Sequence, residues 1–402
     1  MTKVTVAGKI LSMATQTKRA VYVLNLLQKA VAACEARLLD QLRQLVEIES
    51  PSDVKAAVDR CVESVAEIAT EAGGRVRQYR QRDFGDVLEL RFGSAGRGKE
   101  KLAPLMLLGH LDTVWPMGTL SSMPFRIGRG RVWGPGVLDM KAGVVMGLTA
   151  IASLREVDAL RRPVIFLLVG DEEIGSTVSR PVTEKLAREC EAVFVLEPAQ
   201  GLGGAYKTAR KGVGGYTIRV KGVASHSGVD FERGHSAIHE LAWQLEKVRG
   251  FTELDRGLTA NAGVIRGGTR SNVIAAEAEV DVRIARGTDA ARIDRKFRSL
   301  RVRDRGCVLD VEGGMNRPPM ERSRGTVALF ERAATLAAQI GFELEEASTG
   351  GGSDGNFTAA IGVPTLDGMG AVGEGAHASH ESVVLKELVP RTALLAEMIR
   401  TT

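Results

Sequence analysis

The chain has 402 residues, of which 44% are hydrophobic and 26% charged, and its basic residues exceed its acidic ones by 54 − 49 = 5. This length and composition predict a globular protein of more than one domain and exclude collagenous and disordered chains. No uninterrupted apolar run is long enough to span a membrane, so no membrane partner is expected. The mild positive charge, without basic runs interleaved with aromatic residues, gives no support to a nucleic-acid partner.

The four cysteines lie far apart and form no CxxC pair, which argues against a disulfide framework or a cysteine-rich zinc site. The first residues lack the continuous apolar stretch and cleavage site of a secretory signal. We therefore expect a cytoplasmic protein with reduced thiols.

Predicted helices and strands alternate over the first half of the chain. Apolar residues recur at helical spacing from Lys18 to Glu49 and again over 53–72. Strands are predicted at 75–80, 87–92, 104–109, 163–169 and 192–196, with helices at 139–155 and 181–191. This order predicts the α/β class, with a mostly parallel central sheet flanked by helices.

The pattern changes near Gly212. Strands at 214–222 and 276–285 and a helix at 235–249 predict a small inserted α+β domain, after which a helix at 326–340 resumes the first pattern. The predicted organisation is therefore an N-terminal extension (1–35), a discontinuous α/β domain (36–211 and 325–402) and the insert (212–324).

Five short clusters carry side chains suited to chemistry, and most directly follow a predicted strand. They are His110 in GHLDT, Asp139 in GPGVLDMKAG, Glu172 and Glu173 in GDEEIGS, Glu197 in LEP, and His377 in GEGAHASHE. Each residue alone is compatible with a structural role, such as a core histidine, a helix cap or an acidic turn. Because the carboxyl ends of parallel strands meet at one edge of a sheet, together they predict a common site.

Mixed histidine and carboxylate ligands suit zinc or another borderline divalent metal. Two metals would share a bridging carboxylate, and a carboxylate beside the metals but not bound to them would serve as general base. The adjacent pair Glu172 and Glu173 fits that division. Asp112, two residues after His110, is suited to hold the other ring nitrogen of that histidine.

The successive motifs GHLDTV, GPGVLDMKAG, DEEIGS, LEP, KGVASHSG, GGTRSNVI and a late H-x-x-x-E resemble those of the dizinc peptidases that include glutamate carboxypeptidase, aminoacylase and succinyl-diaminopimelate desuccinylase. The resemblance extends from about Leu38 to the C-terminus. It implies that the discontinuous domain is catalytic and that the insert is a lid through which the chain forms a homodimer.

The resemblance also implies five ligands for two Zn²⁺ ions, with Co²⁺ or Mn²⁺ as alternatives. It gives His110 and Glu197 to one ion, Glu173 and His377 to the other, and Asp139 to both, with a cis peptide bond after Asp139. The H-x-x-x-E spacing to Glu381 favours His377, and His380 is the alternative.

Further roles are implied for residues around the metals. Glu172 would be the general base and acid, and Asp112 would orient His110. His226 in SHSG would stabilise the developing oxyanion, commonly across the dimer. Four residues would bind the substrate, with Arg283 holding its free carboxylate: Asn272, Arg283, Gly351 and Gly352.

These roles predict a hydrolase that cleaves the amide bond to a C-terminal amino acid, as glutamate carboxypeptidases do. In the family that the chain resembles, aminopeptidases tend to have aspartate where Glu197 stands, so the resemblance favours carboxypeptidases and deacylases. The expected substrate is a small peptide or N-acyl amino acid with a free carboxylate. Two alternatives stay open: an N-acyl-amino-acid deacylase or desuccinylase, and a non-catalytic binding protein of the same fold.

Overall fold

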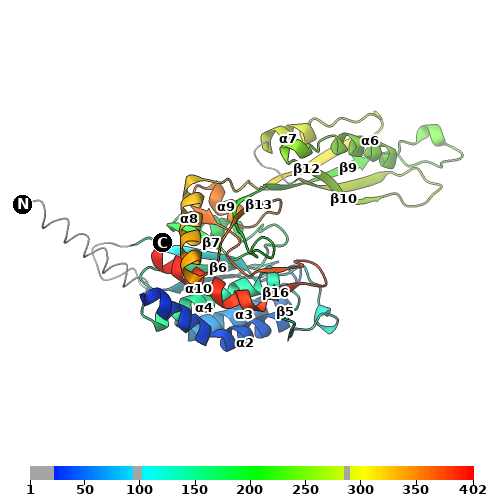
Figure 1. Ribbon diagram of the computed structural model, residues 1–402. Helices are drawn as coiled ribbons and strands as arrows, with labels where there is room; N and C mark the ends of the chain where they lie inside the picture. Colours follow the sequence, from blue (N-terminus) through cyan, green and yellow to red (C-terminus); the bar gives the residue numbers. More distant parts are fainter. Residues whose placement is uncertain (1–21, 94–101, 285–289) are drawn as a thin grey trace, which may run out of the picture. The chain divides into compact units, whose positions relative to one another are not determined.

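The computed structural model describes residues 22–93, 102–284 and 290–402, and its chain divides into two compact units (Figure 1). The first unit comprises the chain up to Thr208, Arg322–Ala347 and Ile361–Thr402. The second comprises Ala209–Glu321 and Ser348–Ala360. The second unit thus takes in the sequence-predicted insert and also residues 348–360, which include the Gly-rich loop and were expected in the α/β domain.

A six-stranded sheet forms the centre of the first unit and has the strand order β1-β2-β6-β3-β7-β14. Its strands are β1 (Arg75–Tyr79), β2 (Val87–Phe92), β6 (Val164–Val169), β3 (Leu105–His110), β7 (Ala192–Val195) and β14 (Thr365–Leu366). β3 runs parallel to both β6 and β7, and β14 runs parallel to β7, whereas β1 and β2 are antiparallel. The sheet is therefore mostly parallel, which confirms the predicted fold class.

Helices cover both faces of this sheet, which explains why its central strands are apolar throughout. Leu105 and Leu107 of β3 belong to a large core, while Met106 and Leu108 face a smaller cluster that includes Leu186. The helices of the unit are α2 (Glu35–Glu47), α3 (Lys55–Glu71), α4 (Ala142–Glu156), α5 (Arg180–Ala187), α8 (Arg324–Ile340) and α10 (Leu385–Thr401). α4 packs against α10 and α2 (Figure 1).

Residues 22–33 are helical and belong to this packing. Leu27 and Val31 are completely buried, and Leu27 is part of the large core. The sequence-predicted extension therefore includes a segment that packs into the first unit, whereas residues 1–21 lie outside the described part of the chain.

One helical stretch in the described residues, Val137–Glu156, is long and apolar enough to cross a membrane, but 89% of its most apolar window is buried inside the protein. Such burial is typical of a helix at the core of a folded domain. The sequence contains no uninterrupted apolar run there because Asp139 and Lys141 interrupt it.

A smaller antiparallel sheet in the first unit joins distant parts of the sequence. Its order is β15-β16-β5-β4, with β15 (Gly373–Glu374), β16 (Ser382–Val384), β5 (Arg131–Trp133) and β4 (Arg126–Gly128). Pairing of Ser382 with Trp133 places the loop before β16 beside the segment that follows β5. A separate two-stranded sheet pairs β8 (Tyr206–Arg210) with β13 (Glu346–Thr349).

The second unit contains an antiparallel sheet with the strand order β10-β11-β9-β12. Its strands are β10 (Ala260–Gly267), β11 (Glu277–Ile284), β9 (Val213–Lys221) and β12 (Val308–Arg317), and its helices are α6 (Ala237–Arg249), α7 (Ala290–Arg298) and α9 (Gly355–Ala360). Alternate residues of β9 are buried, and Tyr216 on that strand stacks on Phe297 of α7 with ring centroids 3.9 Å apart. Ser236 caps α6 by accepting a hydrogen bond from the N–H of His239.

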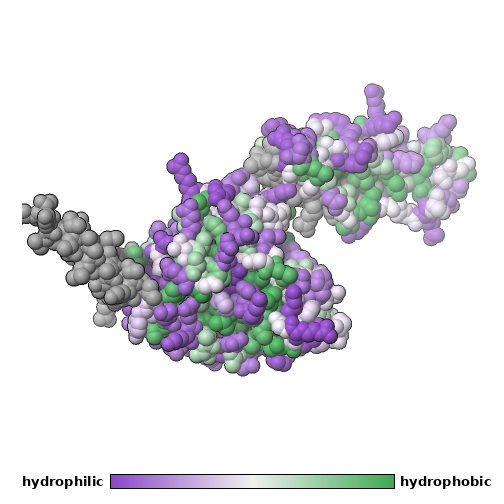
Figure 2. Space-filling view, viewed as in Figure 1, coloured by the Kyte–Doolittle hydropathy of each residue, from purple (hydrophilic) through white to green (hydrophobic). Residues whose placement is uncertain are grey.

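Large hydrophobic side chains reach the surface of the second unit (Figure 2). Ile265 on the edge strand β10 is 60% exposed, and Phe231 in the loop before α6 is 61% exposed. An edge strand that carries exposed apolar residues is a surface that other proteins commonly protect by pairing or covering.

Candidate active site

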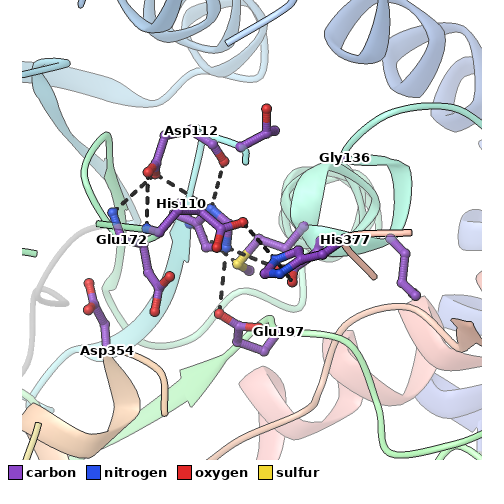
Figure 3. Close-up of polar contacts among 12 residues, drawn as sticks. His110, Asp112, Gly136, Glu172, Glu197, Asp354 and His377 are labelled. Atoms are coloured by element: carbon purple, nitrogen blue, oxygen red, sulfur yellow. Dashed lines mark hydrogen bonds and ion pairs between the residues drawn. The ribbon is translucent and has the colours of Figure 1, made fainter. Parts of the chain in front are cut away.

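His110 is the last residue of β3 and is buried at the end of the central sheet. Its Nδ1 lies 2.9 Å from the main-chain oxygen of Asp112, so this nitrogen carries a hydrogen and donates a hydrogen bond to the carbonyl. The other nitrogen, Nε2, lies 3.2 Å from Oδ1 of Asp139 and 3.6 Å from Oε1 of Glu197 (Figure 3). A ring nitrogen that faces two carboxylate oxygens in this way is a suitable donor set for a divalent cation.

His377 forms the matching half of the cluster. Its Nε2 lies 3.1 Å from Oε1 of Glu173 and 3.3 Å from Oδ2 of Asp139. Asp139 therefore offers one carboxylate oxygen to each histidine, which is the arrangement of a ligand shared between two ions. Of the two histidines in the late motif, His377 is the one that reaches Asp139 and Glu173.

Asp139 lies in an irregular turn that leads into α4. The turn begins at Gly136, whose φ of +69° favours glycine and where an added Cβ would lie 2.6 Å from a methyl group of Thr113. The Asp139–Met140 peptide bond is cis, as the resemblance implied. Met140 contacts the neighbouring strand, because its sulfur accepts a hydrogen bond from the N–H of His110.

Asp112 contacts His110 through its main chain, and its carboxylate contacts the turn of Glu172 and Glu173. Its carboxylate lies 3.6 Å from Nδ1 of His110, beyond hydrogen-bond distance, so it holds the ring through its main-chain oxygen instead. The carboxylate accepts hydrogen bonds from the N–H groups of Glu172 (3.2 Å) and Glu173 (3.1 Å) and from the hydroxyl of Ser52 (2.7 Å). Asp112 thus positions the turn that carries both glutamates, and Ser52, which no sequence motif marks, belongs to the same network.

The two glutamates face different parts of the cluster. Ligand atoms of Glu172, His110 and Glu197 lie within 4.8 Å of one another, as do those of Glu173, His110 and Asp139. Both groups of three are suitable for holding a metal ion, since each combines a histidine nitrogen with two carboxylate oxygens.

The ionisable side chains of the cluster shift one another's pKa. Burial raises the pKa of Asp112 to about 6. Hydrogen bonds to Asp139 and Glu173 raise the pKa of His377 to about 10. Burial lowers the pKa of His110, but Asp139 and the neighbouring carboxylates raise it well above its ordinary value. The carboxylates therefore require positive charge at this place, which divalent ions held by the same side chains would supply.

The remaining sequence-predicted residues lie in the second unit. His226 and Asn272 are neighbours there: the N–H of Ser227 donates to the main-chain oxygen of Asn272 (3.0 Å), and His226 pairs with Val273 in an isolated bridge. Nδ1 of His226 accepts a hydrogen bond from the N–H of Gly228 (3.1 Å), so the neutral ring carries its proton on Nε2.

The sheet of the second unit holds the main chain of Arg283, and a neighbouring arginine holds the Gly-rich loop. The backbone of Arg283 on β11 pairs with Asn261 and Gly215, and its side chain lies outside the described part of the structure. The carbonyls of Gly351 and Gly352 accept hydrogen bonds from the buried guanidinium of Arg210, at 3.1 and 3.3 Å.

A buried ion pair holds the same loop to the second unit. Nη2 of Arg317 lies 3.1 Å from Oδ1 of Asp354, and both side chains are largely buried. Together with Arg210, this pair explains why residues 348–360 belong to the second unit.

The first unit thus presents a cluster of two histidines and four carboxylates at the end of a mostly parallel sheet, which is the kind of site that metal-dependent hydrolases use. Residues 106–401 match the model of peptidase family M20/M25/M40, and the chain belongs to that family. It is therefore a metallo-exopeptidase or a related amidohydrolase, and the metallopeptidases of this family depend on metal ions.

Individual relatives show the range of activities around this chain. It is 27% identical over 397 residues to carboxypeptidase G2 from a Pseudomonas species, with 91% of this chain and 94% of that protein covered. It is 29% identical over 320 residues to a succinyl-diaminopimelate desuccinylase from Paracidovorax citrulli, with 74% and 80% covered. Among solved structures, a tripeptidase from Staphylococcus aureus has the same fold, with a TM-score of 0.74, 20% identity and coverage of 91% and 98%.

Proposed function

We propose that this protein is a carboxypeptidase that hydrolyses the amide bond to a C-terminal amino acid and uses two Zn²⁺ ions, for which Co²⁺ or Mn²⁺ could substitute. The observation that carries the proposal is the position of Asp139, which has one oxygen 3.2 Å from Nε2 of His110 and the other 3.3 Å from Nε2 of His377. His110 and Glu197 would hold one ion, and Glu173 and His377 the other.

Glu172 is the proposed general base. Bound divalent ions would supply a Lewis acid and lower the pKa of the attacking water. Glu172 would take a proton from that water as the water oxygen attacks the scissile carbonyl. It would return the proton to the leaving nitrogen as the C–N bond breaks. The hydrogen bond from its own N–H to Asp112 restricts the Glu172 main chain, which suits a group that must act at a defined place.

The second unit would complete the site as a lid. His226 would donate from Nε2 to the developing oxyanion, consistent with a ring whose Nδ1 already accepts a hydrogen bond. Asn272 and Arg283 would bind the free carboxylate of the substrate, and Gly351 and Gly352 would line the substrate path. We also propose that the second unit forms a homodimer, supported by the exposed apolar side chains of this unit, and that the enzyme acts in the cytoplasm.

The alternative within the same chemistry is an N-acyl-amino-acid deacylase or desuccinylase, which the similarity to desuccinylases favours. A substrate panel tests the proposal: dipeptides, glutamate-terminated compounds of the folate type, and N-acetyl and N-succinyl amino acids, each incubated with zinc-loaded and with chelated protein. Metal-dependent release of a C-terminal residue from peptides or folate-type compounds supports the carboxypeptidase. Release from N-acetyl or N-succinyl compounds alone supports the alternative, and no release from any compound contradicts both.

A further inference from the structure

The carboxylate of Glu381 is completely buried in the first unit and accepts four hydrogen bonds. Oε1 accepts from the N–H groups of Leu138 (2.8 Å) and Asp139 (3.1 Å), and Oε2 accepts from the N–H of Gly136 (3.0 Å) and from the indole of Trp115 (2.8 Å). All four partners are donors, so both oxygens of this carboxylate act only as hydrogen-bond acceptors. Nothing in the proposed reaction uses this group.

Three of the four donors belong to the turn that carries Asp139, and one of them is the main-chain N–H of Asp139 itself. The backbone of Asp139 is not helical, with φ −115° and ψ 91°, so a regular helix does not hold this residue in place. On the other side of the turn, the buried ammonium of Lys141 donates to the carbonyls of Leu45 (2.9 Å) and Ile48 (2.7 Å) at the end of α2. A buried charged side chain therefore fixes the segment at each end.

Glu381 also lies in the loop that carries His377. The N–H of Glu381 donates to the carbonyl of Ala378 (2.8 Å), and the next residue, Ser382, begins β16. One buried carboxylate thus links the turn of Asp139 to the loop of His377, which approach each other to 3.3 Å between Oδ2 and Nε2.

We infer that Glu381 is a positioning residue for the metal centre. It sets the distance between His377 and Asp139, which is the ligand shared by the two ions. The inference rests on the proposed metal centre but is independent of the substrate. Partners that orient metal ligands typically change metal affinity by about 10–100-fold when they are removed.

The substitution Glu381→Gln tests the inference without changing the size of the side chain. The amide offers one acceptor oxygen and one NH₂ group, so in either orientation two of the four donors face another donor. We expect Zn²⁺ affinity, measured by calorimetry on the full chain, to fall by about 10–100-fold. We also expect faster hydrogen exchange either at Gly136 or at Leu138 and Asp139, according to which oxygen the NH₂ group replaces, when both proteins are compared after chelation.

Glu240→Gln is the matched control. Glu240 is a buried carboxylate on α6 of the second unit and likewise accepts from main-chain N–H groups, those of Arg303 (3.0 Å) and Asp304 (2.9 Å). Replacement of this carboxylate by an amide should lower the stability of the fold and leave Zn²⁺ affinity unchanged. Trp115→Phe removes only the indole donor, and it keeps the test available if Glu381→Gln does not fold, with a smaller fall in affinity expected.

The outcomes separate the possibilities. Wild-type Zn²⁺ affinity and wild-type exchange in folded Glu381→Gln would overturn the inference, and so would an equal fall in affinity in Glu240→Gln. If the wild-type chain binds no divalent metal but exchange at the Asp139 turn still rises in Glu381→Gln, the role of Glu381 in holding the turn stands and the proposed function fails.

Discussion

The role of Asp112 can be tested by Asp112→Asn. In the structure its two oxygens accept from the main-chain N–H groups of Glu172 and Glu173 and from the hydroxyl of Ser52. The sequence alone gives Asp112 another task, which is to orient His110 through its carboxylate. The two roles predict different consequences for the same substitution.

The size of the effect follows from the contacts. The NH₂ group of asparagine must face the N–H of Glu172 or that of Glu173, so at least one hydrogen bond to a charged acceptor is lost, which costs about 1.5–3 kcal/mol. Removal of a buried charge offsets part of this cost. We expect a net destabilisation of about 1.5 kcal/mol, equivalent to a fall in Tm of roughly 3–6 °C in a domain of this size.

The assay combines thermal unfolding with hydrogen exchange of the segment 170–179 in chelated protein. Exchange should accelerate at whichever of Glu172 and Glu173 faces the NH₂ group, while the Nδ1 proton of His110 stays protected by the main-chain oxygen of Asp112. Ser50→Ala is the control, because the Ser50 hydroxyl donates to the nearby carbonyl of Leu111 and not to Asp112. Loss of the His110 proton with unchanged exchange at both glutamates would refute this reasoning.

Three further predictions concern the metal centre and the second unit. Glu172→Gln should lower turnover by about 10²–10⁴-fold while the bound metal, measured by elemental analysis, is retained; near-normal turnover would exclude Glu172 as the base. His377→Asn should reduce bound metal and His380→Asn should not, since of these two histidines His377 is the one that lies beside Asp139; an equal loss in both variants would contradict the assignment. Two basic side chains of α7 lower the pKa of Glu253 to about 2, so this carboxylate stabilises the fold above pH 4.5 and the effect is lost as the pH falls toward 2. Glu253→Gln should therefore flatten the pH dependence of urea unfolding over that interval compared with the wild type, and an unchanged slope would show that these pairs contribute nothing.

Much of the site could be predicted because its residues follow apolar strands of the central sheet or stand in distinctive motifs. His110 ends β3, and Glu172 and Glu197 follow β6 and β7 within a few residues. Parallel strands bring such positions to one edge whatever the details of packing, so residue type and order in the sequence predict a shared site there, whereas the role of each residue came from the family resemblance and stays a prediction. The helices that cover both faces of the sheet follow from the same alternation of apolar segments.

The supporting residues could not be predicted in this way. Ser52 and Asp112 are 60 residues apart, and Glu381 and Asp139 are 242 apart, and no local pattern relates the members of either pair. A buried glutamate and a surface glutamate look alike in a sequence, because the difference lies in which donors the folded chain brings to them.

The sequence by itself determined the class of the sheet, the order of its strands along the chain and the residue types available as metal ligands, since these depend on hydrophobic pattern and local chemistry. Only the tertiary structure decided which oxygen of Asp139 faces which histidine, that Asp112 holds the turn of Glu172 and Glu173, and that Glu381 holds the turn of Asp139. These are contacts of a few ångströms between segments distant in sequence, and only the packing of the whole domain sets them.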